Sequence, residues 1–441
     1  NAWGAPGGAS RTGVYYQFCV ENGATYYDFQ QAKNKYGYEN AFSGATSSAM
    51  SEVKTITPMY DAILIDEAQD FDPSFLQLCY HSLTAEKRLV YAYDELQSLT
   101  DASLPAPEVI FGVDAKGKPL VTFDGSVASQ DIILDKCYRN SRPVLASAHA
   151  LGFGIYREPD KKLGTGLTQM FDRAELWTDV GYEVLDGQLE DDQRVRLGRT
   201  KLASPDFLEN PGEVDDLIVF GHFNNANEQA QWIADQIIKN LTKDELRPED
   251  IIVINPDPVS TAKQVGPIRK ILFDKGIPSH LAGVDTSGDV FFKPDEGSVA
   301  FTGIFRAKGN EAGMVYVINA QDCYSSFGEI GKVRNRLFTA MTRSKAWVRV
   351  VGHGANMEAL TREYNAIAKS NYCLDFIYPN EELRARLRVV NRDMSAEEKQ
   401  KVKTAKQTMS TLVQQLAAGD VQLDDLPEGE LQALRDLLGK Q

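Results

Sequence analysis

Cysteine is scarce in this sequence, and the few cysteines form no recognisable pattern. The five residues Cys19, Cys79, Cys137, Cys323 and Cys373 are scattered and include no C-x-x-C pair. Such spacing argues against a zinc site, an iron–sulfur cluster or a disulfide framework, and it indicates a reducing, cytoplasmic setting. The sequence also lacks an apolar stretch long enough to span a bilayer, so we expect neither a membrane segment nor a signal peptide.

The sequence also has no excess of basic over acidic residues. The sequence has 47 Lys and Arg against 62 Asp and Glu, which gives a formal net charge of −15. This balance does not point to a nucleic-acid binder, because phosphate contacts need clustered Lys and Arg, although a local basic channel can lie on an acidic protein. With 441 residues, 43% of them hydrophobic, the chain is long enough for two or three domains and a large core.

The most informative segment of the sequence is an apolar run that ends in two neighbouring acids. Residues 61–71 read D-A-I-L-I-D-E-A-Q-D-F. The short apolar run predicts a strand buried on both faces of a parallel sheet, with Asp66 and Glu67 at its carboxyl end, where open α/β sheets bind ligands. One of these acids can hold Mg²⁺, and its neighbour can deprotonate a water that attacks a phosphoryl group. The alternative is a strand that ends in two solvated acids.

Strand and helix patterns alternate along the middle of the chain. We expect strands at 216–222 and 250–255 and helices at 227–241 and 268–275, an order typical of a doubly wound α/β fold. The segment 395–438 instead shows two amphipathic helices. We interpret them either as a hairpin folded back on the protein or as a docking element for a protein partner or a second copy.

D-E-A-Q-D after an apolar strand resembles motif II of the UvrD/Rep-like superfamily 1 helicases, and further matches follow in the family's order over residues 1–355. Four later segments resemble motifs III, IV, V and VI, namely 94–98, 134–145, 299–318 and 334–351. The resemblance implies an α/β protein with two RecA-like parallel-sheet domains of the P-loop NTPase type. It divides the chain into a partial first domain (1–115), a connector (116–135), a second domain (136–355) and a C-terminal helical extension (356–441).

The resemblance also implies an ATP site between the two domains. Asp66 would hold Mg²⁺, Glu67 would activate the attacking water, and Gln97 would sense the γ-phosphate. Arg139 and Arg343 would neutralise the γ-phosphate from the second domain, because a guanidinium binds phosphate bidentately and keeps its charge. Three further residues would contact the nucleotide: Tyr138 by stacking on adenine, Gly309 through its backbone, and Glu311 by accepting from the ribose.

Contacts to nucleic acid would come from Trp3, Thr302, Phe305 and Lys308. Trp3 sits at the position of motif Ib, and a packed core tryptophan is its alternative interpretation. Phe305 stands where relatives often have His. The short segment 283–301 leaves little room for the helical subdomain that the family usually inserts before motif V.

A motor of this family needs G-x-x-x-x-G-K-[ST] to hold the phosphates, and these 441 residues contain no match. We expect that motif upstream of residue 1, because relatives carry it before motif Ib. With it, the resemblance implies an ATP-dependent DNA helicase or translocase acting on single-stranded or partly duplex DNA, with RNA left open. Movement from 3′ to 5′ and a role in repair or defence are implied as well. The alternative is a catalytically inactive, helicase-like interaction or regulatory module.

Overall fold

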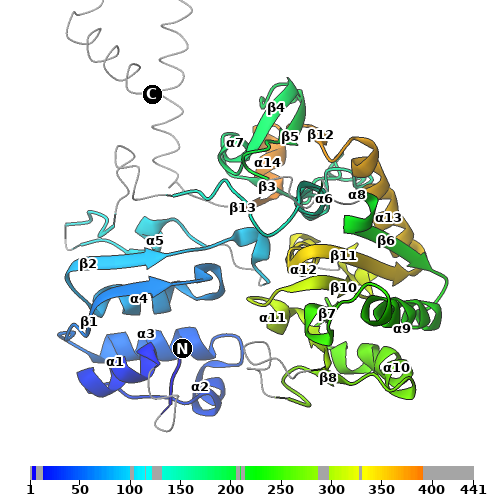
Figure 1. Ribbon diagram of the computed structural model, residues 1–441. Coiled ribbons are helices and arrows are strands. Elements are labelled where there is room, and N and C mark those ends of the chain that lie inside the picture. The colour runs from blue at the N-terminus through cyan, green and yellow to red at the C-terminus, as the bar shows by residue number, and fades with distance from the viewer. Residues whose placement is uncertain are drawn as a thin grey trace, which may run out of the picture.

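The computed structural model is a mixed α/β protein in which a smaller part and a larger part lie side by side (Figure 1). We refer to residues 2–121 as the N-terminal part and to residues 132–390 as the C-terminal part. The structure describes residues 2–5, 13–99, 104–114, 116–121, 132–204, 209, 214–286, 297–326 and 330–390. No helix in these ranges is both long and apolar enough to cross a membrane. The helices predicted within 395–438 lie outside the described residues.

The N-terminal part packs helices around two parallel strands. Its elements are α1 (Val14–Asn22), α2 (Phe29–Tyr36), α3 (Ala41–Glu52), β1 (Tyr60–Ile65), α4 (Pro73–His81), β2 (Leu83–Tyr91) and α5 (Pro107–Phe111). Ile63 of β1 lies opposite Leu89 of β2, and both pack against a buried cluster that includes Phe75 and Leu76 of α4. The strand predicted to carry the two acids is therefore present and parallel to its neighbour.

The other face of this strand pair is open, so the prediction that β1 is buried on both faces is wrong. Leu64 is 80% exposed and its neighbour Val90 is 62% exposed. The physical reason is that α4 and α5 pack on one side only, and no element among the described residues covers the other.

The C-terminal part is built on a six-stranded parallel sheet with the strand order β6-β11-β10-β7-β9-β8. These strands are β6 (Ile218–Phe223), β7 (Ile251–Asn255), β8 (Ser279–Leu281), β9 (Val299–Gly303), β10 (Ala312–Val317) and β11 (Ser344–His353). The predicted strands 216–222 and 250–255 are confirmed as β6 and β7.

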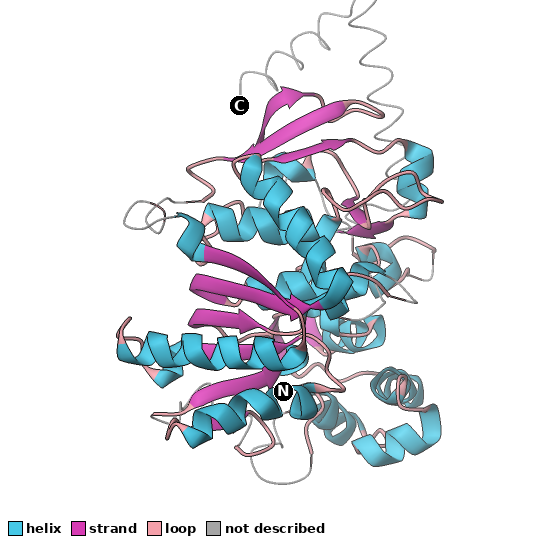
Figure 2. Ribbon diagram, turned by 90° about the vertical axis from the view of Figure 1, so that its right-hand side faces the viewer, coloured by secondary structure: helices cyan, strands magenta, loops and turns pink. Residues whose placement is uncertain are grey.

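Helices cover both faces of this sheet (Figure 2). Ile251 and Val253 of β7 pack with α9 (Ala226–Thr242) and α10 (Thr261–Asp274). The alternate residues Ile252 and Ile254 belong to the cluster on the opposite face, which holds α6 (Arg142–Phe153), α12 (Ile330–Met341) and α13 (Gly354–Lys369). Because successive strand residues point to opposite faces, a continuous apolar run is what such a two-sided core requires.

Two small sheets and several short helices complete the C-terminal part. A three-stranded antiparallel sheet joins β4 (Tyr182–Gly187), β5 (Arg194–Arg199) and β12 (Leu374–Ile377), and a parallel pair joins β3 (Gln169–Phe171) and β13 (Arg388–Val390). The short helices are α7 (Leu176–Asp179), α8 (Val214–Leu217), α11 (Ile304–Ala307), α14 (Glu381–Arg386), η5 (Pro248–Asp250) and η7 (Ala320–Cys323). The last described strands thus return to strands that lie far earlier in the chain.

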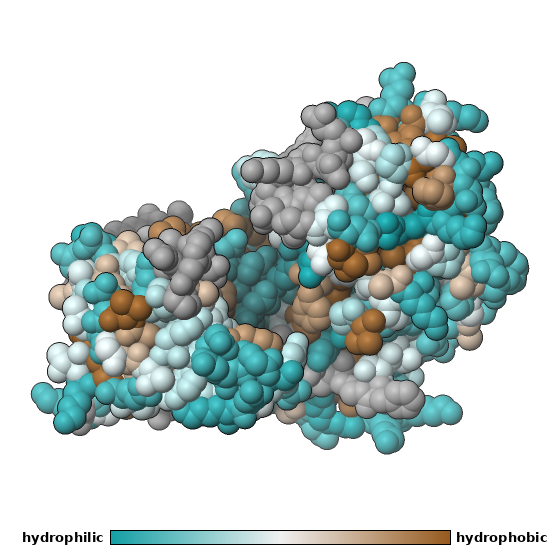
Figure 3. Space-filling model, turned by 90° about the horizontal axis from the view of Figure 1, so that it is seen from below, coloured by the Kyte–Doolittle hydropathy of each residue, from teal (hydrophilic) through white to brown (hydrophobic). Residues whose placement is uncertain are grey.

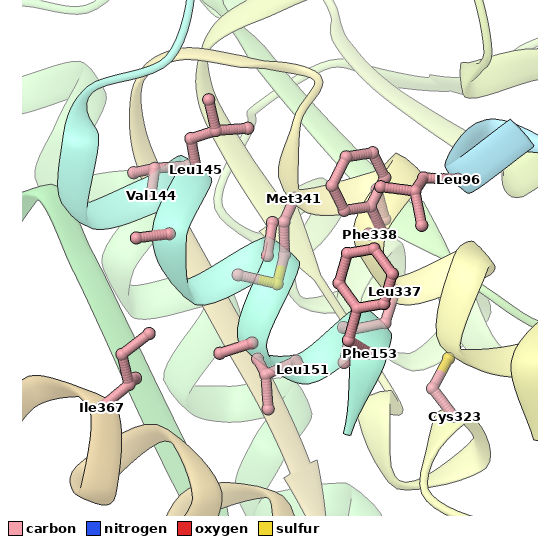
Figure 4. Close-up of a cluster of buried hydrophobic side chains, with 14 of the residues drawn as sticks. Leu96, Val144, Leu145, Leu151, Phe153, Cys323, Leu337, Phe338, Met341 and Ile367 are labelled. Carbon is pink, nitrogen blue, oxygen red and sulfur yellow. The ribbon is translucent and has the colours of Figure 1, made fainter. Parts of the chain in front are cut away.

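A short 3-10 helix of the N-terminal part, η3 (Glu95–Gln97), is anchored in the core of the C-terminal part. Leu96 belongs to the same buried cluster as Leu337 and Phe338 of α12 (Figure 4). The Asn335 amide donates to the backbone oxygens of Glu95 (3.0 Å) and Ser98 (3.1 Å). Because both contacts are buried, η3 is held by α12 although it follows β2 in the chain.

The buried ion pair between Arg334 of α12 and Glu363 of α13 stabilises the core of the C-terminal part. The Arg334 guanidinium donates to both Glu363 oxygens at 2.8 and 2.9 Å, and the two side chains are 0% and 4% exposed. We expect Glu363→Ala to lower the free energy of unfolding by about 3–5 kcal/mol, because it leaves a buried guanidinium unpaired. Urea denaturation measures this loss.

Arg362→Ala is the matched control, because Arg362 precedes Glu363 but forms only exposed ion pairs, with Glu358 and Glu158. Its expected cost is at most about 1 kcal/mol. Equal costs for the two variants would contradict the role given to the buried pair.

Candidate functional site

Two acids follow β1 in a tight turn. Asp66 is exposed, and its Oδ1 accepts from the Glu67 backbone N–H at 2.9 Å. Glu67 has a φ of 54°, in the left-handed region that a non-glycine residue seldom adopts. Such backbone strain is concentrated at functional sites, because surrounding contacts must maintain it.

A continuous chain of hydrogen bonds leads from Glu67 to the C-terminal part. In η2 (Ala68–Asp70), the Gln69 amide donates to Glu67 Oε2 at 2.6 Å and accepts from the Asp94 N–H at 3.1 Å. The Gln97 amide donates to Asp94 Oδ2 at 2.7 Å. The chain then crosses to Arg343, whose guanidinium donates to Gln97 Oε1. The carboxylate and the guanidinium predicted to act together are therefore physically connected.

Lys308 makes a second contact between the two parts. Its Nζ lies 2.8 Å from both Asp70 oxygens and 3.2 Å from Glu67 Oε2, and its side chain is only 7% exposed. The structure thus places Lys308 against the acids, and its predicted contact with nucleic acid stays a prediction. A cation in this position offsets the repulsion between two neighbouring carboxylates.

Arg139 is held on the C-terminal side by Glu311. Arg139 NH1 lies 3.3 Å from Glu311 Oε2, and Lys345 Nζ lies 2.9 Å from the other oxygen of the same carboxylate. Hydrogen bonding from Lys345 is the largest influence that lowers the pKa of Glu311. Arg139 Nε is buried without a hydrogen-bond partner, so this guanidinium keeps a donor for an anionic ligand.

Burial and neighbouring charge shape the electrostatics of the site. Burial, and then the positive charge of Arg139, lower the pKa of Arg343 to about 10, while Glu67 and Asp94 act in the opposite direction. Arg343 still carries its charge at neutral pH. Burial raises the pKa of Asp94, and hydrogen bonds from Gln97 and Leu96 oppose that rise. The site therefore places two guanidinium groups within electrostatic range of several acids, as phosphate binding with a divalent cation requires.

The other predicted site residues differ in how exposed they are and in where they lie. Tyr138 is exposed beside Arg139, and Gly309 adopts a φ of +81° directly after Lys308. Phe305 is exposed on α11, whereas Thr302 is fully buried at the end of β9. Trp3 packs in the N-terminal part: its ring stacks on Phe42 at 4.7 Å, and its indole N–H donates to the Tyr27 backbone oxygen at 3.1 Å. The roles assigned to these residues stay predictions.

Three residues that contribute to the site were not predicted from the sequence: Gln69, Asp70 and Asp94. The first two lie inside the D-E-A-Q-D segment itself, and Asp94 opens the segment that contains Gln97. All three residues were therefore visible in the sequence as members of the two motifs. Their function as connectors appears only when η2 and η3 are placed next to each other.

One segment matches all but the last position of the phosphate-loop motif, but it does not have the structure of a phosphate loop. Residues 112–119 read G-V-D-A-K-G-K-P, with Pro119 where Ser or Thr is needed. Asp114 Oδ1 accepts from the backbone N–H groups of Lys116 (2.8 Å) and Lys118 (2.9 Å), which lower its pKa. The carboxylate thus occupies the amides that a phosphate would need, and Leu120 pairs back to Gly112 in a hairpin.

Part of this site lies in a segment that matches a known protein family. Residues 298–351 match the model of the UvrD-like helicase C-terminal domain, and these residues include Lys308, Glu311 and Arg343. No curated protein matches the chain. Among solved structures, the C-terminal domain of a possible DNA helicase from Lactobacillus plantarum is 18% identical. The match covers 41% of this chain and 88% of that one with a TM-score of 0.25, too low to support a structural argument. Residues 298–351 of this chain are therefore similar to the C-terminal domain of UvrD-like helicases.

Proposed function

We propose that this protein is an ATP-dependent helicase or translocase that couples ATP hydrolysis to movement on single-stranded nucleic acid. In this proposal the two parts are the RecA-like domains of a motor, and ATP with Mg²⁺ binds where they meet. The observation that carries the proposal is the chain of hydrogen bonds from Glu67 through Gln69, Asp94 and Gln97 to Arg343. It supports the proposal because a motor must link the group that activates water to the opposite domain.

Glu67 is the general base in this proposal, and Gln69 positions it. The amide of Gln69 is 5% exposed and bonded at both ends, so it restricts the orientation of the Glu67 carboxylate. Asp66 would hold Mg²⁺, which when bound offsets the charge that develops on the phosphates.

Gln97, Arg139 and Arg343 would handle the γ-phosphate. In the structure Arg343 donates to the neutral amide of Gln97, and Arg139 pairs with Glu311. A phosphate is a stronger, bidentate acceptor for guanidinium groups than an amide is. Both arginines would therefore turn toward the phosphate, which would free Glu311 to accept from the ribose.

Lys308 and η3 would transmit the effect of phosphate binding at the ATP site to the elements that contact nucleic acid. Lys308 contacts Glu67 and Asp70, and in the chain it directly follows α11, which presents the exposed side chain of Phe305. η3 is bonded to α12 through Asn335. A change in the acids or in Gln97 would thus shift elements of the C-terminal part, which supports translocation by opening and closing of the two parts.

The open face of β1 and β2 supports the presence of a further strand–helix unit that carries the phosphate loop. Parallel strands are normally covered on both faces. Within residues 1–441 alone, we expect Leu64→Ala to change the free energy of unfolding by less than about 0.5 kcal/mol, because Leu64 is exposed. In a natural protein that carries the phosphate loop, the same change should cost about 2–5 kcal/mol.

Leu76→Ala is the control for this comparison, because Leu76 is fully buried and should cost about 2–5 kcal/mol in both proteins. Denaturant unfolding measures the cost of each of the two substitutions in each of the two proteins. A negligible effect of Leu64→Ala in the longer protein would contradict the idea that the added unit covers this face.

ATP hydrolysis by the natural full-length protein, measured with and without single-stranded DNA, tests the proposed function. We expect a rate that rises when DNA is added. If the full-length protein has an intact phosphate loop and still hydrolyses no ATP under either condition, it is not an ATP-driven motor.

A second candidate is a non-catalytic interaction or regulatory module on the same fold. The lack of G-x-x-x-x-G-K-[ST] in these 441 residues favours it, and the connected Glu67 and Arg343 oppose it. Sequencing the gene upstream of residue 1 separates the two candidates, because the absence of a phosphate loop there would favour the second.

A further inference from the structure

Two exposed aromatic rings near α2 take no part in the proposed ATP chemistry. Phe29, the first residue of α2, is 48% exposed, and Tyr38, which follows the helix, is 70% exposed. Their rings meet edge to face with centroids 5.9 Å apart, and Trp3 meets the Phe29 ring at 5.8 Å. We call the Phe29 and Tyr38 rings the α2 platform.

The platform stands on a well-packed support. Ala32 of α2 is fully buried in a cluster with Tyr15 and Phe18 of α1 and Ala45 of α3. The start of α2 is closed by a capping box between Asp28 and Gln31. Since the backbone beneath the rings is held in place, a ligand that stacks on them pays little ordering entropy.

Two lysines flank the rings. Lys33 Nζ lies 5.8 Å from the centroid of Tyr38, and Lys35 Nζ lies 4.3 Å above the Tyr27 ring while donating to its hydroxyl at 2.6 Å. Both ammonium groups therefore lie against tyrosine rings, and both residues are exposed, although the charge of Lys35 also acts on Glu52. The nearby acid Asp28 is engaged by the helix cap.

We propose that the α2 platform is a subsite for single-stranded nucleic acid, with a base stacked on Tyr38 and Phe29 and the adjoining phosphates near Lys33 and Lys35. This inference rests on the proposed function and adds a site that its motifs do not include. Exposed aromatic faces accept any base, and ammonium groups complement phosphate. Val20 is the only other large apolar side chain exposed in the described residues 13–55, so the surface lacks the broad apolar core of a protein interface.

The location of the platform suits a path along the junction of the two parts. In Figure 1, α2 lies at the lower end of the N-terminal part, on the side toward the C-terminal part. Seen from below, the molecule is hollowed between the two parts (Figure 3). A single strand that follows this hollow would pass the platform on one part and approach α11, with Phe305, on the other.

Binding of a labelled oligothymidylate to residues 1–441, followed by fluorescence anisotropy, tests the inference without requiring ATP. We expect Tyr38→Ala to weaken binding about 5- to 100-fold, the range for loss of one stacking contact. Tyr38→Phe keeps the ring and should bind like the unchanged protein. Lys33→Gln should weaken binding and reduce the dependence of log K on log salt by about 0.7.

Phe273→Ala is the matched control, because Phe273 is an exposed aromatic on α10, away from the platform. It should leave binding unchanged, and thermal unfolding of each variant checks that the fold is intact. If Tyr38→Ala binds as tightly as the unchanged protein, the platform is not the subsite and a protein partner becomes the better explanation. Equal loss in Tyr38→Phe would also overturn stacking. If the unchanged protein binds no oligothymidylate, this inference fails, whereas the proposed function fails only if the natural full-length protein hydrolyses no ATP with or without single-stranded DNA.

Discussion

ATP hydrolysis by the protein that carries a phosphate loop should fall about 10²- to 10⁴-fold when Glu67 is replaced by Gln, because the variant cannot take a proton from the attacking water. The amide has the size of the carboxylate and can still accept from Gln69, so the turn after β1 should persist. Lys308 retains Asp70 as its partner. We therefore expect kcat to fall while the KM for ATP and the affinity for DNA change little in steady-state assays.

Asp61→Asn provides the control for this experiment, because Asp61 is an exposed acid on β1, the strand that precedes the two site acids. Its rate should match that of the unchanged protein. If Glu67→Gln retains full DNA-stimulated hydrolysis, the general base is another residue and the chain of hydrogen bonds through Gln69 has no catalytic meaning.

Replacement of Arg343 by Ala should reduce hydrolysis about 10³- to 10⁵-fold, the range for loss of an arginine that stabilises the transferring phosphoryl group. Arg343 is nearly fully buried, and its Nε donates to the Thr339 backbone oxygen at 3.1 Å, so the guanidinium starts from a fixed position. Its lowered pKa of about 10 still leaves it protonated at neutral pH. Arg343→Lys should recover only part of the rate, because an ammonium cannot bind phosphate bidentately.

Stability must be separated from catalysis in this variant, because Arg343→Ala leaves Gln97 Oε1 without its donor. Thermal unfolding and binding of a fluorescent ATP analogue provide that separation. A folded variant that binds nucleotide but hydrolyses it slowly supports the assignment. A variant that hydrolyses ATP at the normal rate would remove Arg343 from the site.

The sequence predicted the large parallel sheet well because its strands are short, continuous apolar runs bounded by polar residues. β6 and β7 lie within one or two residues of their predicted ends. α10 was predicted from residue 268, after Pro267, but it begins at Thr261 and contains that proline. Burial of Val265 together with Ile268 and Leu272 outweighs the loss of one backbone hydrogen bond.

The sequence by itself determined which chemical groups are available: two acids after a strand, an amide after the next strand, and two arginines far along the chain. Local patterns carry this information, because a strand end or a helix start depends on neighbouring residues. Only the tertiary structure decided which groups meet. It connects Glu67 to Arg343, turns Lys308 toward the acids, and leaves Leu64 exposed. These outcomes depend on how η2, η3 and α12 pack, and such long-range packing leaves no pattern in a single sequence.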